Sequence, residues 1–249
     1  MEKIIKLNNT SLLIKNTIEE YDEIIENRIT MFDESNNYEN SILIENDKTI
    51  IDIIGKKEVI NGKLVHTDLY QLINNVISNL INNETNIYIH SSVIRNDNNT
   101  IMILGDFNTG KTTLCREAEK NGYKILSADQ SWLQYNTNLE LHKGSLYMAY
   151  SDTYEIIDKI KENIKIDKIL LLLGINDGTL KFYDNNNYYR NIKQLTKFAT
   201  WSTNNILITD DIELSINKKV INDLIKKIDL PIVCASGKSY DIIKKMEEI

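Results

Sequence analysis

The stretch that decides the fold is IYIHSSVIRNDNNTIMILGDFNTGKTTLCREAEKNGYKILSADQ, residues 87–130. At its centre, GDFNTGKT (residues 105–112) matches the pattern GxxxxGK[ST]. The apolar run IMIL precedes this loop, and TTLCREAEKN, closed by Gly122, is typical of a helix. A strand, a glycine-rich loop and a helix in this order are the context in which the pattern binds phosphate. The sequence therefore predicts a nucleotide site.

The residue types of the loop explain why it would hold phosphate. Glycines let the backbone curl closely, so that successive amide groups face phosphate oxygens, and the following helix points its positive end at the same place. Lys111 is expected to reach the β- and γ-phosphates, and the Thr112 hydroxyl is expected to bind Mg²⁺. The residues predicted to contact ATP are Gly105, Asp106, Asn108, Thr109, Gly110, Lys111, Thr112 and Thr113.

Composition and charge narrow the class of protein. The chain has 249 residues, of which 42% are hydrophobic, and a net charge of −7 without a dense Lys/Arg cluster, which argues against a nucleic-acid partner. No apolar run approaches the ~20 residues that span a bilayer, and charges interrupt residues 1–16, which argues against a signal peptide. Cys115 and Cys234 form no metal-binding spacing. We expect a cytoplasmic protein with neither nucleic acid nor membrane as a partner.

Residues 1–84 are expected to form a small α+β region, a candidate for substrate docking. An acidic segment at residues 17–28 favours a short helix, and Asn61-Gly62 between apolar runs is typical of a type I′ hairpin. Residues 68–83 carry Leu, Ile and Val at helical spacing and predict a core-facing helix. Two further runs, residues 41–47 and 49–54, are typical of strands.

From residue 85 to residue 249, strands alternate with helices, which predicts an α/β sheet. The expected strands are residues 87–94, 101–104, 123–129, 168–175 and 204–210, and the expected helices are residues 151–164, 191–202 and 218–228, with residues 231–234 and 239–249 closing the fold. The Tyr-rich residues 182–190 are a candidate lid.

A nucleotide site needs a carboxylate at the end of a neighbouring strand, for Mg²⁺ or for the attacking group. Asp129 ends the strand that follows the helix of the loop, and Asp210 and Asp211 end a later apolar run. Each of these aspartates has the alternative of being a helix cap or a turn residue. His90 lies at the end of another strand, where a single histidine is more often structural than catalytic.

Taken together, IHSSV, GDFNTGKTTL and GYKILSAD resemble the HPr kinase/phosphorylase-related P-loop serine kinases. The resemblance covers residues 87–130 and continues to YYRNIKQLTKFA, residues 188–199, which is similar to the Arg-Asn segment of that family. It implies a P-loop kinase domain that transfers phosphate from ATP, with Mg²⁺, to a serine or threonine hydroxyl of a protein or peptide. By position, Asp129 is expected to act as general base and metal ligand, His90 as the assisting histidine and Arg190 as a charge stabiliser. The resemblance also implies a homo-oligomer, although no heptad pattern supports one.

Two residues depart from the family pattern. Gln130 stands where the family commonly has a second aspartate, and the bulky Phe107 lies in a loop that usually holds small residues. These changes suggest a specialised relative, such as a kinase that phosphorylates a precursor peptide. A metabolite hydroxyl kinase, an ATPase that uses Asp210, and a catalytically degenerate nucleotide-binding regulatory module remain alternatives. The sequence does not identify the phosphate acceptor.

Overall fold

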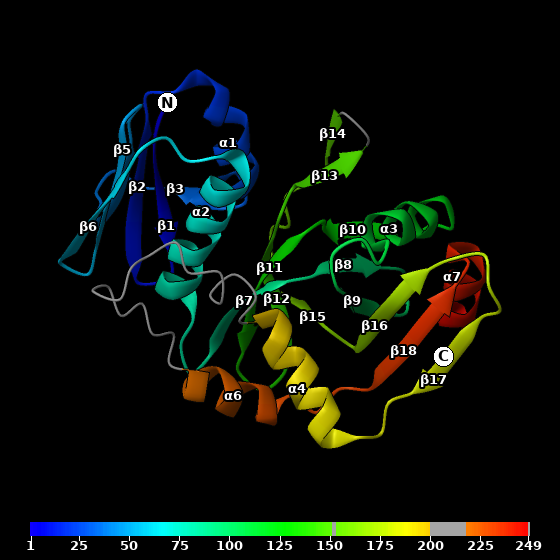
Figure 1. Cartoon of the computed structure of the whole chain (residues 1–249). Helices are drawn as coiled ribbons and strands as arrows, with labels where there is room; N and C mark the ends of the chain where they lie inside the picture. Colours follow the sequence, from blue (N-terminus) through cyan, green and yellow to red (C-terminus); the bar gives the residue numbers. More distant parts are fainter. Residues whose placement is uncertain (151–152, 200–217, 249) are drawn as a thin grey trace. The chain divides into compact units, whose positions relative to one another are not determined.

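The structure is a computed structural model that describes residues 1–150, 153–199 and 218–248 (Figure 1). The chain is a mixed α/β protein that divides into two compact units. The first comprises residues 1–82, and the second comprises the described residues of 83–199 and 219–248. None of the helices in these described ranges is long and apolar enough to cross a membrane.

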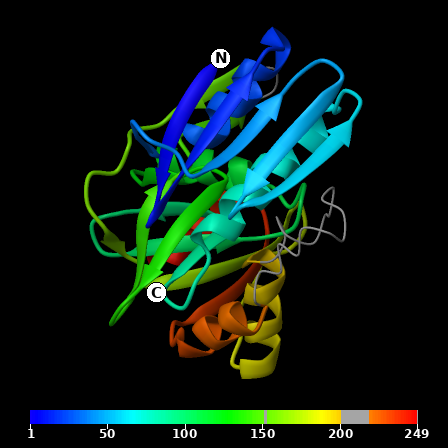
Figure 2. The same ribbon diagram turned by 90° about the vertical axis from the view of Figure 1, so that its left-hand side faces the viewer.

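The first unit is a six-stranded sheet with helices α1 and α2. Its strand order is β3-β1-β2-β4-β5-β6, with β2 and β4 parallel and every other neighbouring pair antiparallel. Figure 2 shows these strands, coloured blue to cyan, side by side. The bounds are β1 Glu2–Leu7, β2 Thr10–Asn16, α1 Asp22–Ile29, β3 Asp33–Glu34, β4 Asn40–Ile44, β5 Lys48–Ile53, β6 Lys56–Asn61 and α2 His66–Ile81.

The helix predicted from apolar spacing is confirmed as α2. Its residues Leu69, Leu72, Ile73, Val76, Ile77 and Ile81 are all buried. The helix predicted at residues 17–28 is present as α1, which a short 3₁₀ turn at Glu19–Tyr21 precedes. Helices α1 and α2 contact each other, so the apolar face of α2 is part of the core of this unit.

The predicted hairpin turn at Asn61-Gly62 is wrong, because Asn61 is the last residue of β6 and no strand follows it directly. The tight turn lies instead between β5 and β6, where Ile53 pairs with Lys56. Ile54 and Gly55, the two residues between them, have φ of 52° and 72°, as a type I′ turn requires. Thr49, Ile51 and Ile53 alternate into the core, and this burial sets the register of β5 and so the place of the turn.

Replacing Ile54 should stabilise the first unit. A β-branched residue in the left-handed region is strained, and Ile54 is 77% exposed, so that it gains little from burial. Ile54→Asn should raise the free energy of unfolding by ~1 kcal/mol, measured by denaturant titration. Val59→Asn, at an exposed position of β6, is the control and should instead lower it, since asparagine is a poor strand residue. An equal loss of stability in both variants would contradict the turn assignment.

The second unit contains a six-stranded sheet in the order β10-β8-β9-β16-β18-β17 and a four-stranded sheet in the order β15-β12-β11-β7, with β13 and β14 as a separate pair. Strands β9, β16 and β18 run parallel, as in α/β folds. The strands are β7 Asn86–His90, β8 Ser92–Arg95, β9 Thr100–Leu104, β10 Lys124–Ser127, β11 Gln130–Tyr135, β12 Leu139–Gly144, β13 Tyr147–Tyr150, β14 Thr153–Ile156, β15 Ile164–Lys165, β16 Lys168–Ile175, β17 Lys181–Asp184 and β18 Ile232–Gly237.

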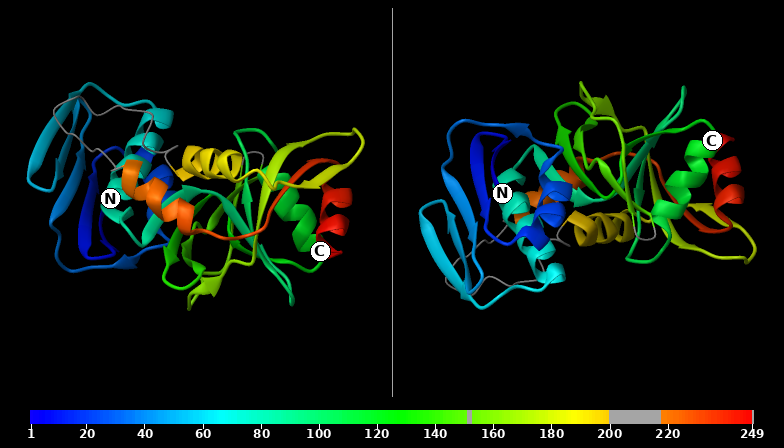
Figure 3. Two further views of the ribbon diagram at one scale, coloured as in Figure 1. Left: turned by 90° about the horizontal axis from the view of Figure 1, so that it is seen from below. Right: turned by 90° about the horizontal axis from the view of Figure 1, so that it is seen from above.

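The helices of the second unit are α3 Lys111–Lys120, α4 Tyr188–Ala199, α6 Lys218–Lys227 and α7 Ser239–Glu247. Helix α3 lies beside α7, as Figures 1 and 3 show in green and red. Leu114 and Ala118 of α3 share one buried cluster with Ile242 and Met246 of α7 and with residues of the central strands. This cluster fixes α3 against the sheet behind the loop.

Two sequence predictions in this unit are wrong. Residues 153–164, the described part of the helix predicted at residues 151–164, do not form a helix, because Thr153–Ile156 is strand β14, which pairs with β13. Residues 87–94 are two strands in two sheets rather than one strand, with a break at Ser91. The candidate lid at residues 182–190 contributes to β17, which pairs with β18, and to the start of α4. The strand predicted at residues 204–210 lies outside the described residues.

The buried thiol of Cys115 should make stability depend on pH. Burial raises its pKa from 9.0 to about 12, so the folded chain keeps a proton that the unfolded chain loses above pH 9. This stabilisation is complete below pH 9 and is lost as the pH rises from 9 to about 12. The free energy of unfolding should fall by up to ~1.4 kcal/mol per pH unit more in the wild type than in Cys115→Ala. Parallel pH profiles for the two proteins would contradict the burial of this thiol.

Candidate functional site

The loop between β9 and α3 approaches strand β16 so closely that two of its positions admit only glycine. A Cβ atom on Gly105 would lie 2.9 Å from the carbonyl oxygen of Leu172 and 2.6 Å from Thr109 Oγ1. A Cβ atom on Gly110 would lie 2.6 Å from Ile175 Cγ1, and its φ of 93° is itself a conformation that favours glycine. Both glycines of the sequence pattern are therefore required by packing.

Hydrogen bonds within the loop hold its curvature. The Thr109 amide and hydroxyl donate to the carbonyl oxygen of Asp106 at 3.3 Å and 2.8 Å. The Ile175 amide donates to the Thr109 carbonyl at 2.8 Å, which ties the loop to the end of β16. Asn108 takes a φ of 60°, which asparagine tolerates better than most residues. The loop is thus anchored to its own backbone and to the sheet.

The first amides of α3 point their partial positive charge at the loop. The Leu114 amide is the first to bond back, to the Gly110 carbonyl at 2.9 Å. Within the described part of the chain, the amides of Lys111, Thr112 and Thr113 have no protein acceptor. The end of a helix with unsatisfied amides attracts anions, so the residues present fit a phosphate group.

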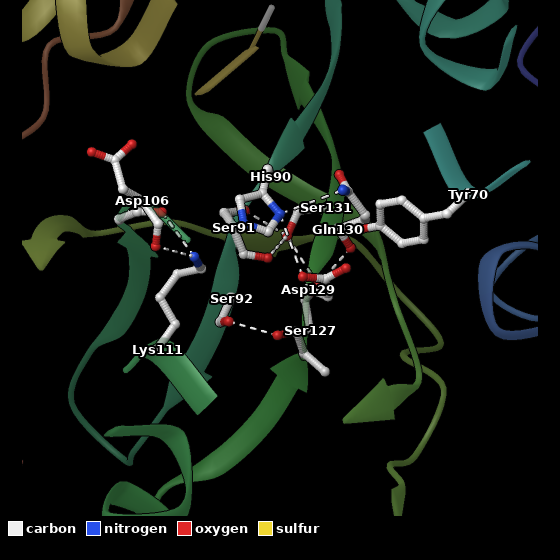
Figure 4. A network of polar contacts seen from close by, with 12 residues as sticks. Tyr70, His90, Ser91, Ser92, Asp106, Lys111, Ser127, Asp129, Gln130 and Ser131 are labelled. Atoms are coloured by element: carbon white, nitrogen blue, oxygen red, sulfur yellow. Dashed lines mark hydrogen bonds and ion pairs between the residues drawn. The ribbon is translucent and has the colours of Figure 1, made fainter. Parts of the chain in front are cut away.

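The glycine loop, residues 105–110, and the first amides of α3 together form a cradle, and Lys111 lies at its centre. Its side chain is buried, and its ammonium group donates to the carbonyl oxygens of Gly105 at 2.8 Å and Asp106 at 3.2 Å (Figure 4). Burial lowers the pKa of Lys111, and the nearby carboxylates of Asp129 and Asp106 oppose that shift. Lys111 is thus within electrostatic reach of Asp129, which is the acid that the sequence predicted for this site.

Two places where the chain passes from one sheet to the other set the position of Asp129. Strand β7 ends at His90 and β8 begins at Ser92, while β10 ends at Ser127 and β11 begins at Gln130. The two crossings lie side by side, because the Ser91 amide donates to the Asp129 carbonyl at 3.0 Å and Gln130 pairs with His90 in the ladder. A third segment passes the same point, since a Cβ atom on Gly144 would lie 2.2 Å from the Leu126 carbonyl oxygen.

The side chains of His90 and Asp129 meet at this crossing. His90 Nδ1 lies 3.3 Å from Asp129 Oδ1, and the Gln130 amide nitrogen lies 3.4 Å from the same ring nitrogen (Figure 4). His90 is 4% exposed, whereas Asp129 is 28% exposed. The Phe107 ring stacks on His90 with 5.5 Å between ring centroids and an interplanar angle of 21°. The buried imidazole therefore holds a carboxylate that solvent and a ligand can reach.

A network of buried serines, which the sequence analysis missed, supports the crossing. Ser91 Oγ donates to Ser131 Oγ at 2.8 Å, and Ser131 Oγ lies 3.0 Å from Ser127 Oγ. Ser127 Oγ donates to the Gln130 carbonyl at 2.7 Å, and Ser92 Oγ donates to the Ala128 carbonyl at 2.7 Å. Small hydroxyl groups satisfy the backbone where strands leave their sheets. The signal was the clustering of serines within and just after two predicted strands, residues 87–94 and 123–129.

The remaining predicted residues lie elsewhere or outside the described ranges. Arg190 is exposed in the first turn of α4 and lies near Cys234, whose pKa it lowers against the larger effect of burial. The cation of α4 that meets the loop is Lys197, whose Nζ lies 2.5 Å from Asp106 Oδ1. Asp210 and Asp211 lie outside the described residues.

The oxygen atoms near the loop suit Mg²⁺ better than a metal ion whose ligands all come from the protein. Among the residues that the structure describes, no group of three or more His, Cys, Asp or Glu side chains could hold a metal ion. Mg²⁺ in phosphate sites takes only one or two protein oxygens and completes its shell with phosphate and water. The hydroxyl of Thr112 and the carboxylate of Asp129 are oxygen donors of this kind.

No known protein-family profile matches the chain, and no curated protein matches its sequence. Among solved structures, the Hpr(Ser) kinase/phosphatase from Coxiella burnetii is similar to 39% of this chain and to 70% of its own chain. The sequence identity is 14% and the TM-score is 0.32. Similarity at this level is too low to assign a family or an activity.

Gly110→Ala should lower the free energy of unfolding more than the same change at a glycine whose Cβ position is open. Gly122 has a similar φ of 86°, but no atom lies within 4 Å of a Cβ built there. Gly122→Ala should therefore lose only the ~1–2 kcal/mol of left-handed strain, whereas Gly110→Ala should lose a further ~1–3 kcal/mol from the contact with Ile175. Denaturant titration measures both. Equal losses would contradict the close packing of the loop on β16.

Proposed function

We propose that this protein is an ATP-dependent kinase that transfers the γ-phosphate of ATP to a serine or threonine hydroxyl of a protein or peptide. The observation that carries the proposal is the convergence of three groups at one place. A glycine loop with a buried lysine, a partly exposed aspartate, and a buried histidine that contacts this aspartate meet where two sheets join. Phosphoryl transfer needs positioning and charge stabilisation of this kind more than covalent help from the protein.

The loop side of the site would hold the phosphates. The amides of Lys111, Thr112 and Thr113 would donate to phosphate oxygens, and the ammonium of Lys111 would exchange its backbone carbonyls for the β- and γ-phosphates. Thr112 and Asp129 would hold Mg²⁺, which neutralises phosphate charge when it is bound. The side chain of Lys111 is buried, and its charge would attract a phosphate more strongly there than in water.

The Asp129 side of the site would receive the acceptor. One carboxylate oxygen accepts the proton of the incoming hydroxyl as its oxygen bonds to the γ-phosphorus, and the bond to the β-phosphate oxygen breaks to release ADP. His90 Nδ1–H would donate to the other oxygen and so orient the carboxylate. His90 is thus a positioning residue, and Asp129 is the general base.

The exposure of this side supports an acceptor that is part of a protein or peptide. Asp129 is partly open to solvent, and Phe107, which stacks on His90, is 59% exposed. A surface carboxylate with an apolar neighbour can meet a hydroxyl that projects from a polypeptide. The motif resemblance of residues 87–130 to HPr-kinase-related enzymes points the same way, and a precursor peptide is one acceptor of this class.

Asp129→Asn tests the proposal, because the amide has the shape of the carboxylate but cannot take the proton. Transfer of radiolabelled γ-phosphate to protein in a lysate of the source cells should fall at least ~100-fold. The affinity for Mg²⁺-ATP should change far less. Asp158→Asn, an exposed aspartate paired with Lys124, is the matched control and should keep full activity.

The distribution of label separates the candidate functions. Label in protein that is lost in Asp129→Asn supports the proposal. Label in small molecules alone would favour a metabolite kinase, and nucleotide binding without any label would favour a regulatory module. Undiminished protein labelling by Asp129→Asn would contradict the role of this residue.

A further inference from the structure

We propose that Lys197 of α4 is a second cation for the bound phosphates and that Asp106 pairs with it at the edge of the loop until nucleotide binds. The inference rests on the proposed function, because it assigns a further binding residue to the same site. Its starting point is the ion pair between Lys197 Nζ and Asp106 Oδ1, at 2.5 Å. Asp106 is the second residue of the glycine loop, so this pair brings a charge from a distant part of the sequence to the phosphate cradle.

Helix α4 is fixed well enough to present Lys197 at a defined place. Leu195, Phe198 and Ala199 are buried, and α4 packs against β7, the strand that ends at His90. Thr196 Oγ1 donates to Asn222 Oδ1 of α6 at 2.7 Å, which ties the same turn to a second helix. These contacts hold the turn that carries Lys197, whose own side chain is half exposed.

Asp106 connects both lysines to the loop in different ways. Its carbonyl oxygen accepts a hydrogen bond from Lys111, and its carboxylate pairs with Lys197. The two ammonium groups therefore lie at the same residue, one from α3 and one from α4. A phosphate chain in the cradle would lie within reach of both.

The charges of Lys197 and Asp106 distinguish a phosphate-binding role of Lys197 from a purely structural role of the ion pair. Lys197 is 49% exposed and Asp106 is 59% exposed, and exposed ion pairs add little to stability. A carboxylate beside the cradle repels phosphate unless a cation balances it. Lys197 offsets this repulsion, and its stem is long enough to turn from the carboxylate to a phosphate oxygen.

The experiment is calorimetric titration of Mg²⁺-ATP and Mg²⁺-ADP into wild type, Lys197→Met, Asp106→Asn and the double variant. Lys197→Met should weaken nucleotide binding about tenfold, since it removes a charge-assisted contact. Asp106→Asn should tighten binding by roughly threefold, because it removes a repulsive charge and releases Lys197. The double variant should fall between the two.

Two controls accompany these variants. Lys193→Met removes an exposed lysine one turn earlier on α4 and should leave the affinity unchanged. Lys197→Arg keeps the charge and should retain most of the affinity. Thermal unfolding of each variant confirms that it is folded, and the arginine variant keeps the test valid if the methionine variant unfolds.

The outcomes distinguish this inference from the proposed function. Opposite effects of Lys197→Met and Asp106→Asn would support a phosphate-binding lysine. Weakening by both variants would mean that the ion pair only braces the loop, and an affinity unchanged in Lys197→Met would also overturn the inference, in each case with the proposed function intact. Absence of nucleotide binding in the wild type would overturn both.

Discussion

The close approach of the glycine loop to strand β16 is the constraint on which the site depends. Gly105 lies against the Leu172 carbonyl and Gly110 against the Ile175 side chain, so that any larger residue would push the loop away from the sheet. This contact sets where α3 begins, and the first residue of α3 is Lys111. The direction of the helix amides and the burial of the lysine both follow from it.

The carboxylate side of the candidate site has a separate origin. The chain leaves one sheet and enters another at Ser91 and again at Asp129, and the two crossings bond to each other. Buried serines satisfy the hydrogen bonds of the backbone at this junction. The junction also places His90 and Asp129 next to each other near the loop. The glycine loop and a carboxylate thus meet because a mixed sheet and an antiparallel sheet share two strand ends.

Local sequence predicted the parts of the fold that local forces determine. The strand, loop and helix around residues 101–120 and the amphipathic helix α2 follow from periodicity and glycine placement. The break at Ser91 could not be predicted in this way, because the residues on both sides favour strands equally and only pairing partners decide which sheet each one joins. The turn at Ile54 and strand β14 were missed for a different reason, since in both places the pairing of a hairpin overrode local propensity.

The residues of the candidate site likewise divide into those that the sequence predicted and those that depend on the packing of distant segments. Lys111 was predicted from the motif, and Asp129 and His90 from their strand ends and the family resemblance, whereas Lys197 reaches the loop only through the packing of α4. Nothing in the sequence distinguishes Lys197 from the other lysines of that helix. The serine network likewise depends on which strand ends meet in space.

The most direct test of the central claim is the binding of Mg²⁺-ATP to the wild type and to Lys111→Ala, measured by calorimetric titration. If the loop is a phosphate cradle, the wild type binds saturably and Lys111→Ala binds at least about tenfold more weakly while it stays folded. A wild type that binds no nucleotide, or a Lys111→Ala variant with unchanged affinity, would contradict the account.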